Sequence, residues 1–310
     1  MANREWGNQT VKEFLLLGFG NLPEGQTLLF LLFLVIYLVT MGGNILIVLL
    51  VVADRHLHTP MYFFLGNLSC LETCYSSTLL PRLLASLLTG DRTISVEGCI
   101  IQLYCFACLL ATECGLLAVM SYDRYLAVCQ PLHYVALMNG RFSLQLAVGS
   151  WLSGFIASTN TACWMSQVTF CGPNKIDHFF CDLTPLLKLS CSDTRLMALV
   201  IFLISMIFIL PPFLLTLTSY LCIISTILRI PSSTGRQKAF STCSSHLIVV
   251  TMFYGTLIVV YMIPDVAELQ DLNKLFSVFY TVLTPLANPL IYSLRNMEVK
   301  EALKNALKRL

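Results

Sequence analysis

Long apolar stretches separated by short polar segments run the length of the chain. Five stretches contain no charged residue, and two more contain a single acid each, Glu72 and Glu113. The first five lie between residues 24 and 54, 141 and 175, 195 and 229, 238 and 265, and 274 and 295; the other two lie between residues 55 and 82 and 97 and 123. Each can hold a helix of about 20 residues, the length that crosses a bilayer. The pattern therefore predicts seven transmembrane helices.

The apolar stretches are continuous rather than alternating, which distinguishes membrane helices from the strands of a membrane barrel. The composition agrees, because 56% of the residues are hydrophobic, 12% are charged and the mean hydropathy is +0.76. Such values exclude ordinary soluble domains. We expect an all-α integral membrane protein in which residues 1–310 form one domain. It comprises an outer tail (1–25), a seven-helix bundle and a short amphipathic helix on the inner membrane surface (296–310).

Basic residues indicate which end of the chain lies inside. With a cytoplasmic carboxyl terminus, the inner segments carry eleven Lys and Arg against four Asp and Glu, and the outer segments carry eight against eleven. Cytoplasmic loops are enriched in Lys and Arg, so this orientation is favoured and the amino terminus lies outside. No cleavable signal peptide is expected, because the first 24 residues are polar and mixed. Asn8 begins an Asn-Gln-Thr acceptor for glycosylation on the predicted outer side.

Four of the 13 cysteines lie on the predicted outer side, which is oxidising. They are Cys99, Cys171, Cys181 and Cys191. Four such cysteines predict two disulfides, and the spacing leaves all three pairings open. A metal site made of His178, Cys181 and Asp182 is a rival use, but metal binding needs a free thiolate, which a disulfide would remove.

Four long motifs lie at the predicted cytoplasmic ends of the helices. They are Leu57–Leu65 (LHTPMYFFL), Met120–Tyr125 (MSYDRY), Lys238–Leu247 (KAFSTCSSHL) and Pro285–Asn296 (PLANPLIYSLRN). In this order they resemble the motifs of odorant receptors, a family of G-protein-coupled receptors. Gly43–Asn44, Trp151 and Ser219–Tyr220 extend the resemblance over nearly the whole chain. The departures are small, Glu72 for example standing where the family frequently has Asp.

The resemblance implies a multi-pass receptor of the plasma membrane. Such a receptor binds small, mostly hydrophobic volatile odorants and activates a heterotrimeric G protein of the stimulatory or olfactory class, which raises cyclic AMP. The resemblance also implies the pairings Cys99–Cys181 and Cys171–Cys191, which would hold a lid over an outer pocket. Neither a nucleic acid partner nor a catalytic residue is expected.

The resemblance further implies a two-state switch at the inner ends of the helices. Its residues are Asp123, Arg124, Tyr125, Tyr220, Asn288, Pro289 and Tyr292. Arg124 would pair with Asp123 at rest and reach the G protein when released. The proline weakens the seventh span, because it removes a backbone donor, so that the span can shift.

The two interior acids are expected to point into the bundle and to face each other. A carboxylate facing lipid costs about 2.5 to 3.5 kcal/mol on insertion scales. Glu113 lies eleven residues before Arg124, which places both on one face of the helix. Two close carboxyl groups resist double ionisation, so Glu72 and Glu113 share either one proton or a cation. The resemblance implies sodium as the cation, and no other cofactor is expected.

Apolar and aromatic residues at helical spacing predict a ligand pocket in the outer half of the bundle. They are Phe106, Ala107, Leu110, Ala111, Ile204, Phe208, Tyr254, Leu257, Ile258, Tyr261 and Thr281. Tyr261 is the preferred polar anchor. No acid belongs to this lining, and Phe106 stands where amine receptors of the superfamily carry an acid. A cationic ligand is therefore disfavoured.

A transporter would use Glu72 and Glu113 as a coupling site, but the sequence shows no inverted repeat. An intramembrane enzyme would need a nucleophile with a base, or metal ligands, at membrane depth, and no such constellation is present. A non-olfactory chemosensory receptor for a small metabolite is the remaining alternative, because helix-end motifs do not name the ligand.

Overall fold

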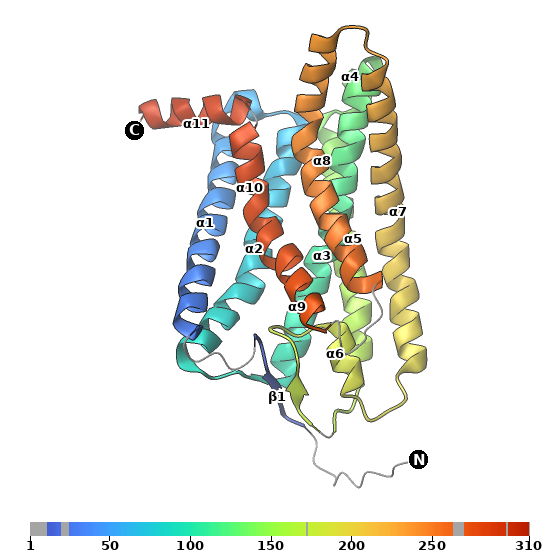
Figure 1. Ribbon diagram of the computed structural model, residues 1–310. Helices are drawn as coiled ribbons and strands as arrows, with labels where there is room; N and C mark the ends of the chain where they lie inside the picture. Colours follow the sequence, from blue (N-terminus) through green and yellow to red (C-terminus); the bar gives the residue numbers. More distant parts are fainter. Residues whose placement is uncertain (1–10, 20–24, 172, 263–269, 296, 310) are drawn as a thin grey trace.

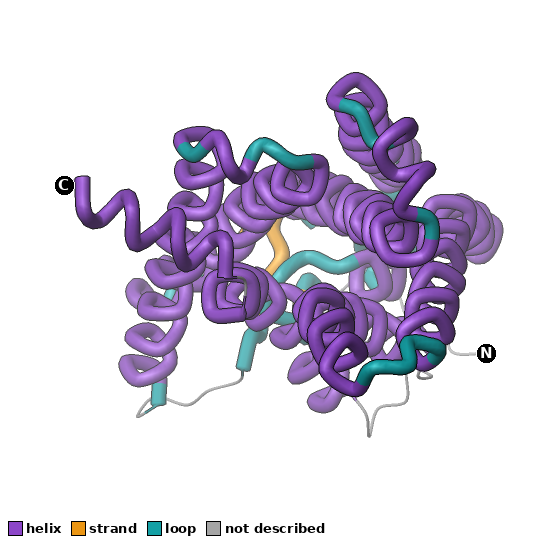
Figure 2. The backbone as a smooth tube through the Cα atoms, turned by 90° about the horizontal axis from the view of Figure 1, so that it is seen from above, coloured by secondary structure: helices purple, strands orange, loops and turns teal. Residues whose placement is uncertain are grey.

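The computed structural model describes residues 11–19, 25–171, 173–262, 270–295 and 297–309. Within these ranges, long helical rods stand side by side (Figure 1), and the view along the bundle shows them end-on (Figure 2). Six of the rods are α1 (Gln26–Ala53), α2 (Pro60–Thr89), α3 (Val96–Cys129), α5 (Gly140–Met165), α7 (Arg195–Leu228) and α8 (Ser233–Met262). The seventh consists of α9 (Gln270–Val278), the π-helix η3 (Phe279–Leu283) and α10 (Thr284–Arg295). The predicted seven-helix bundle is confirmed.

Only some helices of this bundle are apolar enough to be recognised individually as membrane-spanning. Among the described residues, α1, α3 and α7 are long and apolar enough to cross a membrane, as is α8 if its two bent halves count as one span. The other rods carry more polar groups, among them Glu72 and Arg82 of α2. Their place in the membrane follows from their packing against the apolar rods.

Helix α3 is the most enclosed element of the bundle, packed against α2, α5 and α7. It begins at Val96, where the side chain of Ser95 accepts a hydrogen bond from the backbone N–H of Gly98 at 3.0 Å. Against it, Gly154 brings the backbone of α5 so close that a Cβ atom there would overlap Thr112 and the carbonyl of Cys108. A glycine is required at this contact, because any larger residue would push the two helices apart.

A small sheet caps the end of the bundle that the sequence predicts to lie outside the cell, called the outer end below. Strand β1 (Glu13–Leu16) lies between β2 (Thr93–Ser95) and β3 (Lys175–Ile176), antiparallel to the first and parallel to the second. Its side chains alternate, so that Phe14 and Leu16 are buried beneath the sheet. The tail predicted at 1–25 thus contains an ordered strand, which adds a minor β element to the expected all-α fold. Asn8 lies outside the described residues.

Short helices cover both ends of the bundle. On the end away from the sheet, η1 (Arg55–Leu57) and α4 (Pro131–Leu137) join neighbouring rods, and α11 (Met297–Arg309) runs outward from the bundle (Figures 1 and 2). Val299 and Ala302 of α11 are buried, whereas Lys300, Lys304 and Lys308 are exposed. This is the predicted amphipathic helix, and its apolar face packs against α1 and η1.

Both disulfides have the pairing that the resemblance implied. Cys99 of α3 is joined to Cys181 across 5.5 Å between Cα atoms, and Cys171 is joined to Cys191 across 5.7 Å. Because Cys181 is oxidised, the rival metal site loses its thiolate, and no metal-binding group of three or more His, Cys, Asp or Glu exists among the described residues. Helix α6 (Leu183–Lys188) continues the loop that begins at β3.

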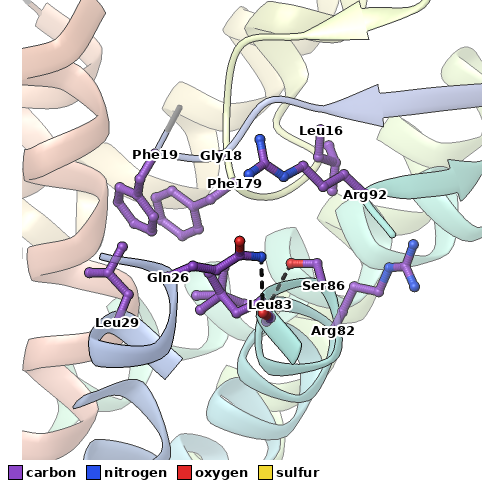
Figure 3. A pocket seen from close by; sticks show the side chains of 11 residues that line it. Leu16, Gly18, Phe19, Gln26, Leu29, Arg82, Leu83, Ser86, Arg92 and Phe179 are labelled. Carbon is purple, nitrogen blue, oxygen red and sulfur yellow. Dashed lines mark hydrogen bonds between the residues drawn. The ribbon is translucent and has the colours of Figure 1, made fainter. Parts of the chain in front are cut away.

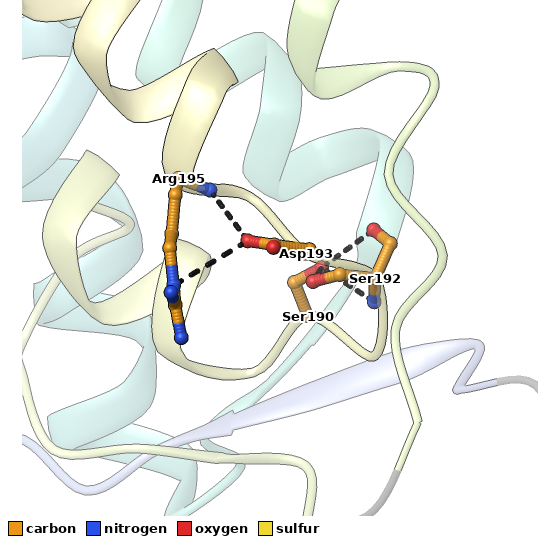
Figure 4. A network of polar contacts seen from close by, with 4 residues as sticks. All are labelled: Ser190, Ser192, Asp193 and Arg195. Atoms are coloured by element: carbon orange, nitrogen blue, oxygen red, sulfur yellow. Dashed lines mark hydrogen bonds and ion pairs between the residues drawn. The ribbon is translucent and has the colours of Figure 1, made fainter.

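A polar turn around Cys191 leads into α7 (Figure 4). The carboxylate of Asp193 accepts a hydrogen bond from the backbone N–H of Arg195 at 3.1 Å and lies 3.7 Å from the Nε atom of the same residue. Ser190 and Ser192 close the turn through their hydroxyl groups, 3.0 Å apart. The long outer loop is therefore anchored at its end as well as at its disulfides.

The contact at Gly154 gives the first testable prediction. Gly154→Ala should lower the stability of the folded receptor by about 1 to 3 kcal/mol, as overpacking of a dense contact usually does. Gly149→Ala on the same helix should have no such effect, because nothing lies within 4 Å of the added Cβ. Thermal unfolding of the purified receptor and cell-surface labelling measure both variants. Equal stability of the two would contradict the packing described here.

Candidate ligand pocket and switch

A cluster of aromatic rings surrounds Phe106 in the outer half of the bundle. The Phe106 side chain is only 2% exposed, and its ring centroid lies 5.0 Å from that of Phe180, 5.6 Å from Tyr75 and 6.0 Å from Tyr280. The four rings come from α3, the outer loop, α2 and η3. Offset and tilted ring contacts at these distances are attractive. The cluster therefore joins three rods and the loop into one apolar site.

The outer loop is held over this cluster by several independent contacts. One turn above Phe106, the side-chain oxygen of Gln102 accepts a hydrogen bond from the backbone N–H of Cys181 at 3.0 Å, next to the disulfide to α3. On the other side, Lys274 forms an ion pair with Asp177. These contacts make the loop the roof of the predicted pocket.

His178 adds a contact between the roof and α9. Its Nε2 atom lies 3.3 Å from the hydroxyl oxygen of Ser277, and its ring stacks on Phe179 with centroids 4.7 Å apart. Burial lowers the pKa of His178 to about 3. The ring is therefore neutral at physiological pH, so this contact is a hydrogen bond between neutral groups.

The predicted pocket residues divide into three groups. Most are buried inside the bundle: Phe106, Leu110, Ala111, Tyr254, Leu257 and Thr281. Ala107, Ile204 and Phe208 are partly buried. Ile258 is 46% exposed and lies on the outer surface of α8, so its assignment to the pocket is wrong. The side chain of Tyr261, the preferred anchor, lies outside the described residues.

The buried tyrosine of α8 lies deeper than the aromatic cluster. The hydroxyl of Tyr254 donates to the backbone carbonyl of Cys114, at 3.4 Å, which is two turns below Phe106 on α3. Its ring packs on Phe213 with centroids 5.1 Å apart. Tyr254 therefore connects α3, α7 and α8 beneath the site.

A buried acid that the sequence analysis did not place in the pocket lies at its roof. Asp182 is 7% exposed, and its carboxylate accepts a hydrogen bond from the backbone N–H of Leu183 at 2.7 Å. Burial raises the pKa of Asp182 to about 6. The adjacent Cys181 is tied to α3, which brings this acid to the outer end of the bundle. Hydropathy alone could not reveal this, because Asp182 belongs to a loop.

A separate small cavity lies beside the roof, between the tail and the outer ends of α1 and α2 (Figure 3). Phe19, Leu29 and Phe179 form its apolar wall, and Arg82 and Arg92 lie on its polar side. The side-chain amide of Gln26 donates to the carbonyl of Leu87 at 3.0 Å and links the two helices at this point. None of the predicted pocket residues lines this cavity.

The two interior acids meet in the middle of the bundle, as predicted. Glu72 and Glu113 are 0% and 1% exposed, and their carboxyl groups lie close enough to interact electrostatically with each other. Asn288 of α10 donates a hydrogen bond to Glu72. One oxygen each of Glu72, Glu113 and Asn288 has no hydrogen-bond partner among the described residues. Carboxylate and amide oxygens are the ligands that hard cations prefer, so these residues fit a small cation.

Prolines alter the seventh rod beside these acids. Pro289 has no N–H to donate to the carbonyl of Pro285, and the side chain of Asn44 in α1 donates to that carbonyl instead, at 3.2 Å. Gly43 allows the approach, because a Cβ there would come within 3.0 Å of Pro289. The π-helix η3 precedes this region, and π-turns of this kind are frequent at functional sites.

The inner end of α3 carries the predicted resting ion pair. Arg124 lies 3.3 Å from the buried carboxylate of Asp123, which also accepts a hydrogen bond from the hydroxyl of Tyr134 in α4 at 3.2 Å. Burial and the nearby aspartate raise the pKa of Tyr134 to about 12, so this hydroxyl keeps its proton and remains a donor. The resting arrangement thus includes a loop residue that the sequence analysis missed.

The remaining switch residues are less directly connected. The hydroxyl of Tyr220 is hydrogen-bonded to the buried imidazole of His246, which joins α7 to α8. Tyr125 accepts a hydrogen bond from Gln130 at 2.9 Å. The side chain of Tyr292 lies outside the described residues. His246 stands in the motif at the start of α8, but nothing in the sequence alone identified its partner.

Comparison with known proteins identifies the family. The profile of the olfactory receptor family matches residues 33–309. The chain belongs to the olfactory receptor family. Olfactory receptor 6B1 of Homo sapiens is 50% identical over 301 residues, which cover 97% of this chain and 96% of that protein. Olfactory receptor 11L1 of Homo sapiens is 51% identical over 300 residues, covering 97% and 93%.

The fold has a solved counterpart. The crystal structure of squid rhodopsin matches with a TM-score of 0.73, covering 94% of this chain and 87% of that chain, at 17% sequence identity. At this identity the likeness establishes the fold alone. As an olfactory receptor with a rhodopsin fold, the chain is a multi-pass protein of the plasma membrane.

The buried pair at the inner end of α3 gives the second prediction. Asp123→Asn should raise ligand-independent signalling by about tenfold, because hydrogen bonds to a charged group contribute about 1.5 kcal/mol or more. Cyclic AMP in unstimulated cells, divided by the surface amount of receptor, measures the effect. Asp54→Asn is the matched control, because Asp54 lies on the same end of the bundle and caps only η1. Unchanged basal signalling in Asp123→Asn would show that the pair does not hold the resting state.

Proposed function

We propose that this olfactory receptor binds small, mostly hydrophobic odorants in the outer half of its bundle and activates a heterotrimeric G protein of the stimulatory or olfactory class, raising cyclic AMP. The observation that carries the proposal is the layout of α3. Its outer part holds Phe106 within the aromatic cluster, under a roof pinned by a disulfide, and its inner end holds the Asp123–Arg124 pair. Names of the relatives support odorants over the alternative of a non-olfactory metabolite ligand.

The proposed ligand site suits a largely apolar molecule. The rings around Phe106 and the apolar side chains of Leu110, Ala111 and Leu257 supply the contact surface. Pockets for small ligands are mostly apolar, with a few polar groups that set orientation. The deeper Tyr254, which connects α3, α7 and α8, gives a ligand above it a route to the helices that must move.

The proposed orientation places the β-sheet cap outside the cell and α11 in the cytoplasm. The two lie at opposite ends of the bundle (Figure 1), and the α11 end carries the basic excess. Positive charge favours the cytoplasmic side. The disulfides near the cap agree, because they form in the oxidising exterior.

We further propose that sodium binds between the two interior acids and stabilises the resting state. Glu72, Glu113 and Asn288 would hold the ion through the oxygens that lack partners among the described residues. A shared proton is the competing occupant, since one protonated acid can donate to the other. The ion would supply positive charge that compensates the two buried carboxylates.

Arg124→Ala tests the receptor function. The variant should lose the cyclic AMP response to every activating odorant while reaching the cell surface, because the side chain proposed to reach the G protein is absent. A panel of volatiles and a cyclic AMP reporter provide the measurement. Arg141→Ala, at an exposed position at the start of α5, should respond as the unchanged receptor does. Full odorant responses in Arg124→Ala would exclude the proposed mechanism.

The sodium proposal has its own test. In membranes containing the receptor and its G protein, replacing sodium with N-methylglucamine should increase odorant potency by about fivefold or more, the usual scale of coupling between two sites. Glu113→Gln should abolish this dependence, because the amide removes one charge from the pair. If replacing sodium leaves the odorant potency of the unmutated receptor unchanged, the shared proton is favoured over the sodium ion.

A further inference from the structure

The hydroxyl of Tyr75 is an unusual feature of the aromatic cluster. Tyr75 is 1% exposed, and its hydroxyl oxygen has no hydrogen-bond partner among the described residues. A buried polar group left without a partner destabilises the fold, because it has given up its hydrogen bonds to water. Such a group in a native interior calls for an explanation, and a bound molecule is one.

The position of this hydroxyl points to the ligand site. Its ring packs on Phe106 at 5.6 Å. Tyr280 in η3, the interior acids Glu113 and Glu72 and, most weakly, Asp182 in the roof act electrostatically on its hydroxyl. A ligand resting on Phe106 would thus have a phenol on the α2 side and a carboxylate above it. No described donor other than the backbone N–H of Leu183 reaches the Asp182 carboxylate.

The two groups have complementary hydrogen-bonding abilities. A phenol hydroxyl donates one hydrogen bond, and an ionised carboxylate only accepts. The pKa of Asp182, about 6, leaves it mainly ionised at the neutral pH of the cell exterior. A ligand hydroxyl can accept from Tyr75 and donate to Asp182 at once. A carbonyl or ether oxygen can accept from Tyr75 but donates nothing to the carboxylate, whose one described donor is then the backbone N–H of Leu183.

We propose that Tyr75 and Asp182 form the polar end of the ligand pocket and select odorants that carry a hydroxyl group. The assignment rests on the proposed odorant-receptor function and deepens it, because it names a ligand class and moves the anchor from α8 to α2 and the roof. Sites built to hydrogen-bond a hydroxyl reject analogues that lack it, since the buried polar groups of the protein are then left unpaired.

The test uses two series of ligands, and within each series the ligands share a carbon skeleton and differ in the oxygen group. The probes are 1-octanol, octanal and methyl octyl ether, together with benzyl alcohol, benzaldehyde and benzyl methyl ether, assayed beside a broad volatile panel with the cyclic AMP reporter. In the unchanged receptor, alcohols should be more potent than the matched ethers by about tenfold or more, the effect of one hydrogen bond to a charged group. A panel whose activators all lack a hydroxyl would refute the assignment.

Two conservative variants separate the two roles. Asp182→Asn should lower alcohol potency by about tenfold and leave aldehyde and ether potency nearly unchanged, because only a donor uses the carboxylate. Asparagine can still cap α6, so the loop should keep its start. Tyr75→Phe should lower the potency of alcohols and aldehydes together, because both accept from the phenol.

Matched controls carry the same substitutions at uninvolved sites. Tyr104→Phe removes a hydroxyl on the outer side of α3 that lies 3.4 Å from Thr159, and Asp193→Asn changes a carboxylate whose side chain is 74% exposed. Neither should alter the ratio of alcohol to ether potency. This ratio compares ligands within one variant, so it does not depend on the surface amount of receptor. If Tyr75→Phe fails to reach the surface, Asp182→Asn decides the assignment.

The outcomes distinguish this inference from the proposed function. Suppose that the unmutated receptor and both variants respond to odorants with the same ratio of alcohol to ether potency. This result would overturn the role of Tyr75 and Asp182 and would leave the proposed receptor function standing. Absence of any cyclic AMP response to the whole volatile panel, from receptor present at the surface, would instead contradict the proposed function.

Discussion

A polar side chain inside a bilayer must find its hydrogen-bond or ion-pair partner within the protein. In this receptor, three polar side chains of α3 make such contacts. Gln102, Glu113 and Arg124 follow one another at intervals of eleven residues, about 16 Å or three helical turns. Gln102 accepts a hydrogen bond from the outer loop, Glu113 lies beside Glu72, and Arg124 forms an ion pair with Asp123. One face of one helix thus connects the outer site, the middle of the membrane and the inner end. Because lipid offers no hydrogen bonds, this face can only point inward.

The seventh rod is held differently from the other six. Its prolines remove backbone donors, and its π-turn changes the register of the helix between Phe279 and Leu283. Side chains of neighbouring helices replace part of the lost bonding, as Asn44 does for the carbonyl of Pro285. A helix whose hydrogen bonds come partly from neighbouring helices can exchange one set of contacts for another. The free energy that this exchange requires is lower than for a regular helix. This makes the seventh rod and its contact with Glu72 a natural place for a two-state change.

The outer cap determines what the pocket can recognise. Strand β1, the two disulfides and the contacts of Gln102 and His178 hold the long loop against the bundle from several sides. Phe180 consequently becomes one wall of the aromatic cluster, and Asp182 becomes a polar group at its roof. A loop so constrained presents a prepared surface, which reduces the entropy lost when a small ligand binds.

The sequence alone determined the seven spans, the amphipathic helix at the end of the chain, the inward direction of Glu72 and Glu113 and the presence of two outer disulfides. It could do so because the absence of charge over about 20 residues and the cost of burying charge in lipid are local properties. The disulfide pairing and the residues of the switch came from the resemblance to odorant receptors.

Only the tertiary structure decided which side chains share the outer site. Helices that are apolar on every side carry little information about their rotation, because lipid and protein interior are equally apolar environments, and so Ile258 was assigned to the wrong face. Tyr75, Asp182 and Tyr280 meet Phe106 from α2, a loop and η3, and no local pattern links positions so far apart in the chain. The sequence did not predict strand β1 in the tail for the same reason. A strand of four residues exists only where partners from two distant loops complete its hydrogen bonds.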